Sequence, residues 1–122
     1  MGAQENKVQN AIIRTFGTRR DMRIWRNNVG SVRFKGRVVK FGVPGQADIS
    51  GILPGGIRLE IECKSAVGRQ EKDQRNFQRM IERFGGIYVL ARSVDDVWAK
   101  IGRYLGQADE VEAEETEDAE AD

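Results

Sequence analysis

The residues best suited to chemistry in this sequence are Asp48, Glu62 and Lys64. Glu62 and Lys64 are two positions apart, and side chains along an extended strand alternate between its two faces. Both would therefore project from one face, with Cys63 on the other. Two carboxylates beside an ammonium group can hold a divalent cation and activate a water molecule, which is the minimal set of groups for metal-assisted phosphodiester hydrolysis.

Carboxylate ligands of this kind suit Mg²⁺ or Mn²⁺ and leave coordination positions for water and a phosphate oxygen. Lys64 can position or deprotonate the attacking water and stabilise the charge that develops on the phosphorane. A less specific interpretation is an exposed strand face, since Glu-x-Lys triplets are common. The turn sequence Gly-x-Pro-Gly-x-x-Asp that ends at Asp48 favours a site, because a bend at Pro44 can bring Asp48 to the Glu62 strand.

Two further polar residues lie on predicted helices. Gln74 is on the same face of the helix predicted at 70–84 as Phe77 and Ile81, so its amide should meet a buried partner or look into a site. The alternative is a helix-start glutamine that bends to solvent. Glu5 has two interpretations. It can be an acidic residue in the first turn of a helix, favoured there by the helix dipole, or, more specifically, an additional carboxylate near the metal.

Charge is distributed unevenly along the chain. The 122 residues contain 20 Lys and Arg and 19 Asp and Glu, for a net charge of +1. Nine of the acids and none of the bases lie in residues 109–122, so residues 1–108 hold 20 basic and 10 acidic side chains, a net charge of +10. A balance this basic favours binding to phosphate backbones.

The basic residues are densest between positions 19 and 40, where Trp25 and Phe34 are interleaved with them. Phosphate contacts to duplex or branched DNA are the functional interpretation, and a solvated strand face is the alternative. The residues that we expect to contact DNA are Arg19, Arg20, Arg26, Arg33, Lys35, Arg37, Lys40 and, further along the chain, Arg69.

A single cysteine and the absence of histidine exclude several kinds of chemistry. Cys63 has no partner for an internal disulfide, and histidine-ligated zinc, Ser-His-Asp and Cys-His catalysis are all excluded. No apolar run reaches the roughly 18 residues of a membrane span, and the N-terminus has no apolar signal core. We therefore expect a soluble, cytoplasmic protein without membrane association.

Hydrophobic periodicity predicts an α/β domain with a mixed sheet between helices. Helices are expected at 4–16, 70–84 and 94–105, strands at 23–26, 47–50, 57–64 and 87–91, and a β-hairpin at 32–34 and 37–41 around Lys35-Gly36. Residues 1–108 are assigned to one domain.

The acidic segment 109–122 has too few apolar residues to offset the entropy of ordering and is expected to be a disordered tail. It can serve solubility, or fold back onto the basic body as a weak, salt-sensitive mimic of DNA.

Several segments, taken in order, carry a resemblance to a known family. They are Trp25-Arg26-Asn27-Asn28-x-Gly30, Phe41-Gly42-Val43-Pro44-Gly45-Gln46-Ala47-Asp48-Ile49, Glu60-Ile61-Glu62-Cys63-Lys64, Gly68-Arg69-Gln70, Gln74 and Gly85-Gly86-Ile87-Tyr88-Val89. Over roughly residues 5–100 the chain resembles the VRR-NUC group of the PD-(D/E)xK nuclease superfamily. It departs from the strict Pro-Asp dipeptide, because Pro44 stands four residues ahead of Asp48.

The resemblance implies a restriction-endonuclease-like mixed sheet flanked by helices, in the order α-β-β-β-α-β-α, for a nuclease domain at 1–108. Asp48 and Glu62 would be metal ligands, Lys64 the catalytic lysine, Gln74 the glutamine that follows the motif, and Glu5 the helix-1 glutamate beside the metal. The implied activity is that of a Mg²⁺- or Mn²⁺-dependent, structure-specific DNA endonuclease.

Stand-alone members of the group resemble Holliday-junction resolvases that act on branched DNA as homodimers. Such forms are common in phages and prophages, which implies a bacterial or phage-infected cytoplasm. Two alternatives stay open: a module that binds branched DNA without cutting it, and a sequence-specific restriction-type nuclease, for which the short chain leaves little room for base-reading elements.

Overall fold

The computed structural model describes residues 2–28 and 30–106. The predicted acidic tail, 109–122, lies outside these residues. In chain order, the elements are a helix, five strands, a helix, a strand and a helix, with two short 3-10 turns.

Four strands form the central sheet, in the spatial order β1-β4-β5-β6. Their bounds are β1 (Arg23–Arg26), β4 (Ile49–Leu53), β5 (Ile57–Cys63) and β6 (Ile87–Ala91). β4 runs antiparallel to both β1 and β5, whereas β6 runs parallel to β5. A parallel pair needs a crossover connection, and α2 (Lys72–Arg83) lies in that connection.

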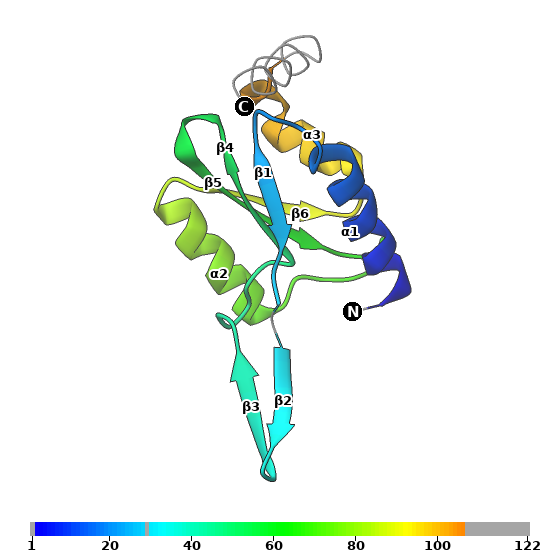
Figure 1. The fold of residues 1–122 in the computed structure, drawn as a ribbon, viewed down its shortest axis with the longest axis vertical. Coiled ribbons are helices and arrows are strands. Elements are labelled where there is room, and N and C mark those ends of the chain that lie inside the picture. The colour runs from blue at the N-terminus through cyan, green and yellow to red at the C-terminus, as the bar shows by residue number, and fades with distance from the viewer. Residues whose placement is uncertain (1, 29, 107–122) are drawn as a thin grey trace, which may run out of the picture.

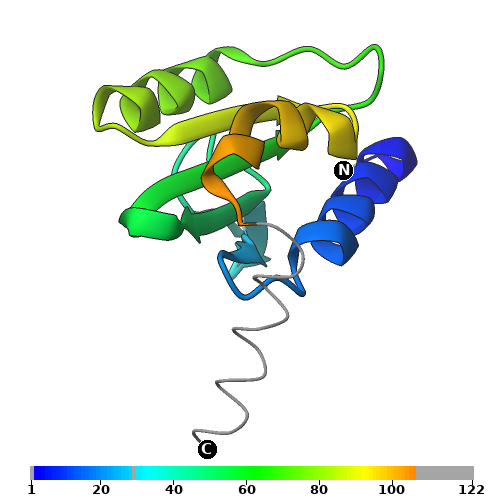
Figure 2. The same ribbon diagram turned by 90° about the horizontal axis from the view of Figure 1, so that it is seen from above.

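Helices cover both faces of this sheet (Figure 1). α1 (Ala3–Phe16) and α3 (Val94–Ile101) lie on one face and α2 lies on the other. The connection from β5 to α2 passes the N-terminal end of α1 (Figure 2). These layers confirm the predicted α/β class with a mixed sheet between helices.

Alternation along β5 separates its apolar side chains from its polar ones. Leu59, Ile61 and Cys63 face the larger core, in which Phe16 of α1 and Val97 of α3 are fully buried. On the opposite face, Glu60 and Glu62 lie beside a smaller cluster formed by Ala47, Phe77, Ile81 and Tyr88. The α2 face of the sheet therefore buries acidic groups.

The predicted β-hairpin forms a separate two-stranded sheet. β2 (Gly30–Phe34) and β3 (Arg37–Phe41) pair antiparallel with each other. The hairpin projects from the body along the long axis of the molecule, beyond the end of the sheet where β1 ends and β4 begins (Figure 1).

The element bounds differ from the predicted ones at a few ends. β4 extends to Leu53, since it pairs along its length with both neighbours, and Pro54 opens the 3-10 turn η1 (Pro54–Gly56). The last helix ends at Ile101 instead of 105, and a second 3-10 turn, η2 (Gly102–Tyr104), follows it.

None of the helices in the described residues combines the length and the apolar character needed to cross a membrane.

Candidate active site

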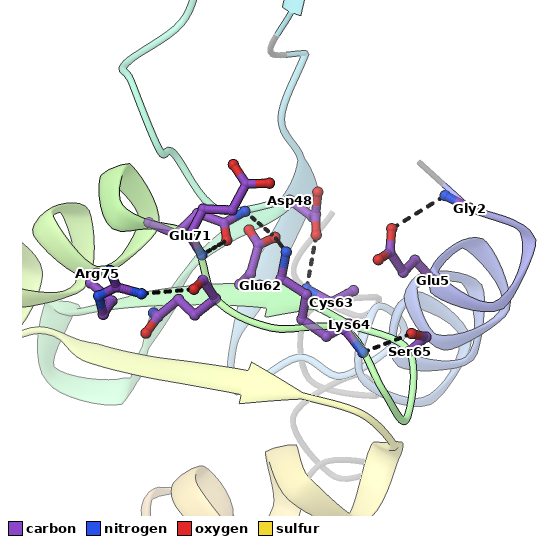
Figure 3. Close-up of polar contacts among 12 residues, drawn as sticks. Gly2, Glu5, Asp48, Glu62, Cys63, Lys64, Ser65, Glu71 and Arg75 are labelled. Atoms are coloured by element: carbon purple, nitrogen blue, oxygen red, sulfur yellow. Dashed lines mark hydrogen bonds and ion pairs between the residues drawn. The ribbon is translucent and has the colours of Figure 1, made fainter.

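Asp48 and Glu62 lie on neighbouring strands at the same end of the sheet. Ile49 pairs with Ile61 in the antiparallel register of β4 and β5, so the residues next to this pair, Asp48 and Glu62, lie close together on the α2 face. Asp48 Oδ2 accepts a hydrogen bond of 2.8 Å from the backbone N–H of Cys63 (Figure 3). The predicted approach of Asp48 to the Glu62 strand is confirmed.

The Glu62 side chain is buried and only partly paired. The residue is 4% exposed and Lys64 is 8% exposed, which excludes the interpretation of this triplet as a solvated strand face. Glu62 Oε2 accepts a hydrogen bond of 2.8 Å from Gln74 Nε2 and lies 3.7 Å from Lys64 Nζ. Glu62 Oε1 is buried, and no described residue forms a hydrogen bond with it. Such an atom is costly unless another group binds it.

Burial and mutual repulsion disfavour charge on both carboxylates. Burial, followed by the negative charge of Asp48, raises the pKa of Glu62 to about 8, although Lys64 opposes the shift. Burial also raises the pKa of Asp48, and Glu5 adds to this rise, whereas the Cys63 N–H and Lys64 lower it. The positive charge of Lys64 therefore does not fully offset the burial and mutual repulsion of the two acids.

Gln74 is held at both ends of its amide. Its nitrogen donates to Glu62, and its oxygen accepts a hydrogen bond of 2.8 Å from the backbone N–H of Glu71, the residue that caps α2. The predicted buried partner is confirmed, and Gln74 satisfies one of the free N–H groups at the helix start as well.

The turn before Asp48 packs against the same helix start. Gly45 has a φ of +75°, and a Cβ at this position would lie 2.1 Å from the carbonyl oxygen of Asp73. Only glycine permits this approach without displacement. The turn that leads to Asp48 and the helix turn that carries Gln74 are therefore positioned against each other.

Glu5 lies in the first turn of α1, near the acidic pair but not joined to it. Its Oε2 accepts a hydrogen bond of 3.2 Å from the backbone N–H of Gly2, in a capping arrangement. Its charge contributes to the raised pKa values of Asp48 and Glu62. Figure 3 shows it on α1, across from the strand residues. The first-turn role is thus observed, together with an electrostatic influence on the site.

The acidic pair has the chemistry of a site for a hard divalent cation. It offers carboxylate oxygens, one of them buried and unpaired, and its charge repulsion would be relieved by a cation. In the described residues no three Asp, Glu, Cys or His side chains form a metal-binding cluster. Within the described residues, Glu5 is therefore not grouped with Asp48 and Glu62 as a third ligand.

A second polar network on this face was not predicted. Asn27 Nδ2 donates to Ala47 O at 2.8 Å and to Ser50 Oγ at 2.7 Å. Ser50 Oγ donates in turn to Glu60 Oε1 at 2.9 Å, and Arg58 Nε donates to Glu60 Oε2 at 2.6 Å. Glu60 is 0% exposed.

This network fixes the backbone at Asp48, just before the start of β4. The backbone N–H of Asn27 also donates to Asp48 O at 2.9 Å, so Asn27 binds the residues on both sides of the Asp48 peptide. The signal in the sequence was the spacing of two within each pair, Asp48 with Ser50 and Glu60 with Glu62, which places each pair on one face of its strand. The pairing of Ser50 with Glu60 puts both pairs on the same face of the sheet.

The basic residues predicted to contact DNA fall into two groups. Arg19 has a side chain only 14% exposed; it forms an ion pair with Asp21 at 2.8 Å, donates to Gly106 O and stacks over Trp98. Arg26 donates to Asn10 of α1. Both therefore bind within the protein, because tertiary contacts place acceptors beside them.

Arg26 is exposed as well, as are the members of the other group, which are Arg20, Arg33, Lys35, Arg37 and Arg69. Lys40 belongs to β3, and its side chain lies outside the described part of the structure. Three members of this group lie on the projecting hairpin, a short distance along the chain from Asp48.

Comparison with protein-family models, with curated proteins and with solved structures gave no match for this chain.

Proposed function

We propose that this chain is a Mg²⁺- or Mn²⁺-dependent endonuclease that hydrolyses phosphodiester bonds in branched DNA. The observation that carries the proposal is the buried, unpartnered Glu62 Oε1 beside Asp48 and Lys64. The motif order that resembles the VRR-NUC group supports the same assignment, with a restriction-endonuclease-like fold for the body of the chain.

In this proposal Asp48 and Glu62 hold the cation with their carboxylate oxygens. A divalent cation bound there supplies Lewis acidity and lowers the pKa of an attached water molecule. Lys64, whose ammonium group lies on the same strand face, orients the attacking water and stabilises negative charge on the phosphate in the transition state. Gln74 positions Glu62 through the 2.8 Å hydrogen bond and leaves Oε1 available.

A DNA substrate is supported by charge. Residues 1–108 have a net charge of +10, and between Asp21 and Asp48 the chain carries six basic residues and no acid. This segment leads directly into the candidate site, so a phosphate backbone bound along it would reach the acidic pair. A homodimer that acts on Holliday junctions in a bacterial or phage-infected cytoplasm is the form that the family resemblance suggests.

The test is cleavage of a four-way junction, a flap, a splayed arm and a linear duplex of shared sequence, each with Mg²⁺, Mn²⁺ or EDTA. We expect metal-dependent cleavage of branched DNA, loss of activity in Asp48→Asn and Lys64→Met, and full activity in Lys100→Ala, a matched removal of an exposed lysine on α3. Cleavage by the Asp48 and Lys64 variants at the wild-type rate would overturn the mechanism.

The exposed basic hairpin favours a second candidate, a module that binds branched DNA without cutting it. Binding of the junction with equal affinity in EDTA and in Mg²⁺, combined with intact substrate under every metal condition, would identify this function instead.

A further inference from the structure

The β2–β3 hairpin is the part of the molecule that the hydrolytic site does not use. Phe34, 61% exposed, and Val38, 58% exposed, lie on it. A two-stranded hairpin is marginally stable in water by itself, and these two apolar side chains are open to solvent. An arm of this kind is typical of a binding element.

The tip of the hairpin combines one aromatic ring with cations. Lys35 and Gly36 have φ values of 51° and 75°, which is the conformation of a tight two-residue hairpin turn. Phe34 pairs with Arg37 across the strands, so these two side chains share a face at the tip. Lys35 Nζ lies 5.5 Å from the centre of the Phe34 ring.

The base of the hairpin is tied to the candidate site. The segments that flank the hairpin are joined by hydrogen bonds, since Asn27 donates to Asp48 O at 2.9 Å and to Ala47 O at 2.8 Å. Each strand of the hairpin has five residues, so the tip reaches about 17 Å beyond its base. That distance equals about five base pairs of B-DNA.

We propose that this hairpin binds branched DNA by stacking Phe34 on a base exposed where two DNA strands separate. Arg33, Lys35 and Arg37 bind the phosphates on either side. The positive charge of the hairpin favours DNA as its binding partner. No acidic residue lies between Asp21 and Asp48 that would attract a basic protein surface. An aromatic ring flanked by cations suits unpaired bases of any sequence.

The proposal deepens the proposed function and rests on its choice of DNA as substrate, but not on cleavage. It assigns the recognition of strand separation to the hairpin and leaves hydrolysis to Asp48, Glu62 and Lys64. A linear duplex offers the hairpin phosphates but no exposed base, so only branched or frayed DNA uses both contacts.

The experiment measures binding in EDTA, where no hydrolysis occurs. The probes are a splayed-arm DNA with 2-aminopurine at the first unpaired position and a linear duplex of the same sequence. We expect the wild-type protein to quench 2-aminopurine fluorescence on binding. Phe34→Ala should lose the quenching and bind the splayed arm about tenfold more weakly, with duplex affinity unchanged.

Two matched variants control this result. Phe34→Trp should restore quenching and affinity, since it returns an aromatic ring to the tip. Val38→Ala removes an exposed apolar side chain from the opposite face of the hairpin, where Val38 pairs with Arg33, and should behave as wild type. Arg37→Ala should weaken binding to both DNAs and reduce the salt slope by about one.

Unchanged affinity and quenching in Phe34→Ala would overturn the proposal. A Phe34→Ala protein that binds both DNAs normally but is monomeric by light scattering, where the wild type is dimeric, would also overturn it and assign the hairpin to self-association. Because the measurement needs no cleavage, an inactive enzyme that still shows the Phe34 effect refutes only the proposed hydrolysis.

Discussion

Gln74 joins Glu62 to the start of α2: its amide nitrogen donates to Glu62 Oε2 at 2.8 Å, and its amide oxygen accepts from Glu71 N at 2.8 Å. The carboxylate of β5 and the first turn of the helix packed on it are therefore positioned together. The second carboxylate oxygen of Glu62 stays free of protein partners. This arrangement orients the Glu62 carboxylate through one oxygen and leaves the other oxygen available.

Replacement of Gln74 should impair both catalysis and folding stability. We expect Gln74→Leu to lower the single-turnover rate by about tenfold or more, because Glu62 loses the contact that orients its carboxylate. The unfolding free energy should fall by about 1–3 kcal/mol, since Glu62 Oε2 loses a hydrogen bond and the Glu71 N–H loses its acceptor. Arg79→Ala, an exposed change on the same helix, is the control. An equal effect of both variants on the rate would contradict the positioning role.

The approach of Gly45 to α2 gives a prediction about stability. Gly45→Ala should lower the unfolding free energy by about 3 kcal/mol or more, since its Cβ would meet the backbone of Asp73 and the φ of +75° strains any side chain. Gly55→Ala has a similar φ of +85° and nothing within 4 Å, and should cost only about 1 kcal/mol. Urea denaturation of the two variants measures the difference.

The raised pKa of Glu62 predicts how the stability of the metal-free protein depends on pH. A carboxyl whose pKa rises from 4.5 to about 8 on folding binds its proton more tightly in the folded state. Stability should therefore fall as the pH rises from about 4.5 to 8, by at most about 1.4 kcal/mol per pH unit from Glu62. The raised pKa of Asp48 acts in the same direction, and Glu5 and Lys64 face the pair with opposite charges.

Denaturation in EDTA across this pH range measures the effect. Glu62→Gln, which cannot ionise, should flatten the profile, and Mg²⁺ should stabilise the wild type more at pH 8 than at pH 5, because it binds the ionised carboxylates. A wild-type profile that rises through this range would refute the prediction.

Asn27 gives a prediction about the entrance to β4. Asn27→Ala removes the hydrogen bonds to Ala47 O and Ser50 Oγ and should cost about 1–2 kcal/mol of stability. It should also lower the cleavage rate, since the Ala47–Asp48 peptide loses the hydrogen bond from the Asn27 side chain that positions it. Asn28→Ala, an exposed change one residue further on, is the matched control. Thermal denaturation and single-turnover cleavage compare the two, and a normal rate in Asn27→Ala would remove the positioning role.

Local rules were enough for part of the fold and of the site. The alternation of β5 placed Glu62 and Lys64 on one face and Cys63 on the other, because strand geometry depends on the backbone and not on distant neighbours. The apolar spacing of residues 70–84 likewise placed Gln74 on the inward side of α2. The hairpin turn at Lys35-Gly36 followed from its residue types.

Other properties of these residues depended on packing between distant segments. Whether Glu62 is buried or solvated depends on where α2 and the Gly45 turn lie, and neither position is encoded near residue 62. Arg19 pairs locally with Asp21, but only the fold brings Trp98 and Gly106 beside its guanidinium group.

The sequence by itself determined the chemistry that is available: two carboxylates, a lysine, no histidine and a basic body with an acidic end. The tertiary structure decided which of these groups meet. It placed Asp48 next to Glu62, left one carboxylate oxygen unpaired and set the basic hairpin outside the main sheet. Residue types and periodicity are local, whereas strand register and helix packing bring together residues far apart in the chain, and only these long-range contacts turn a set of side chains into a site.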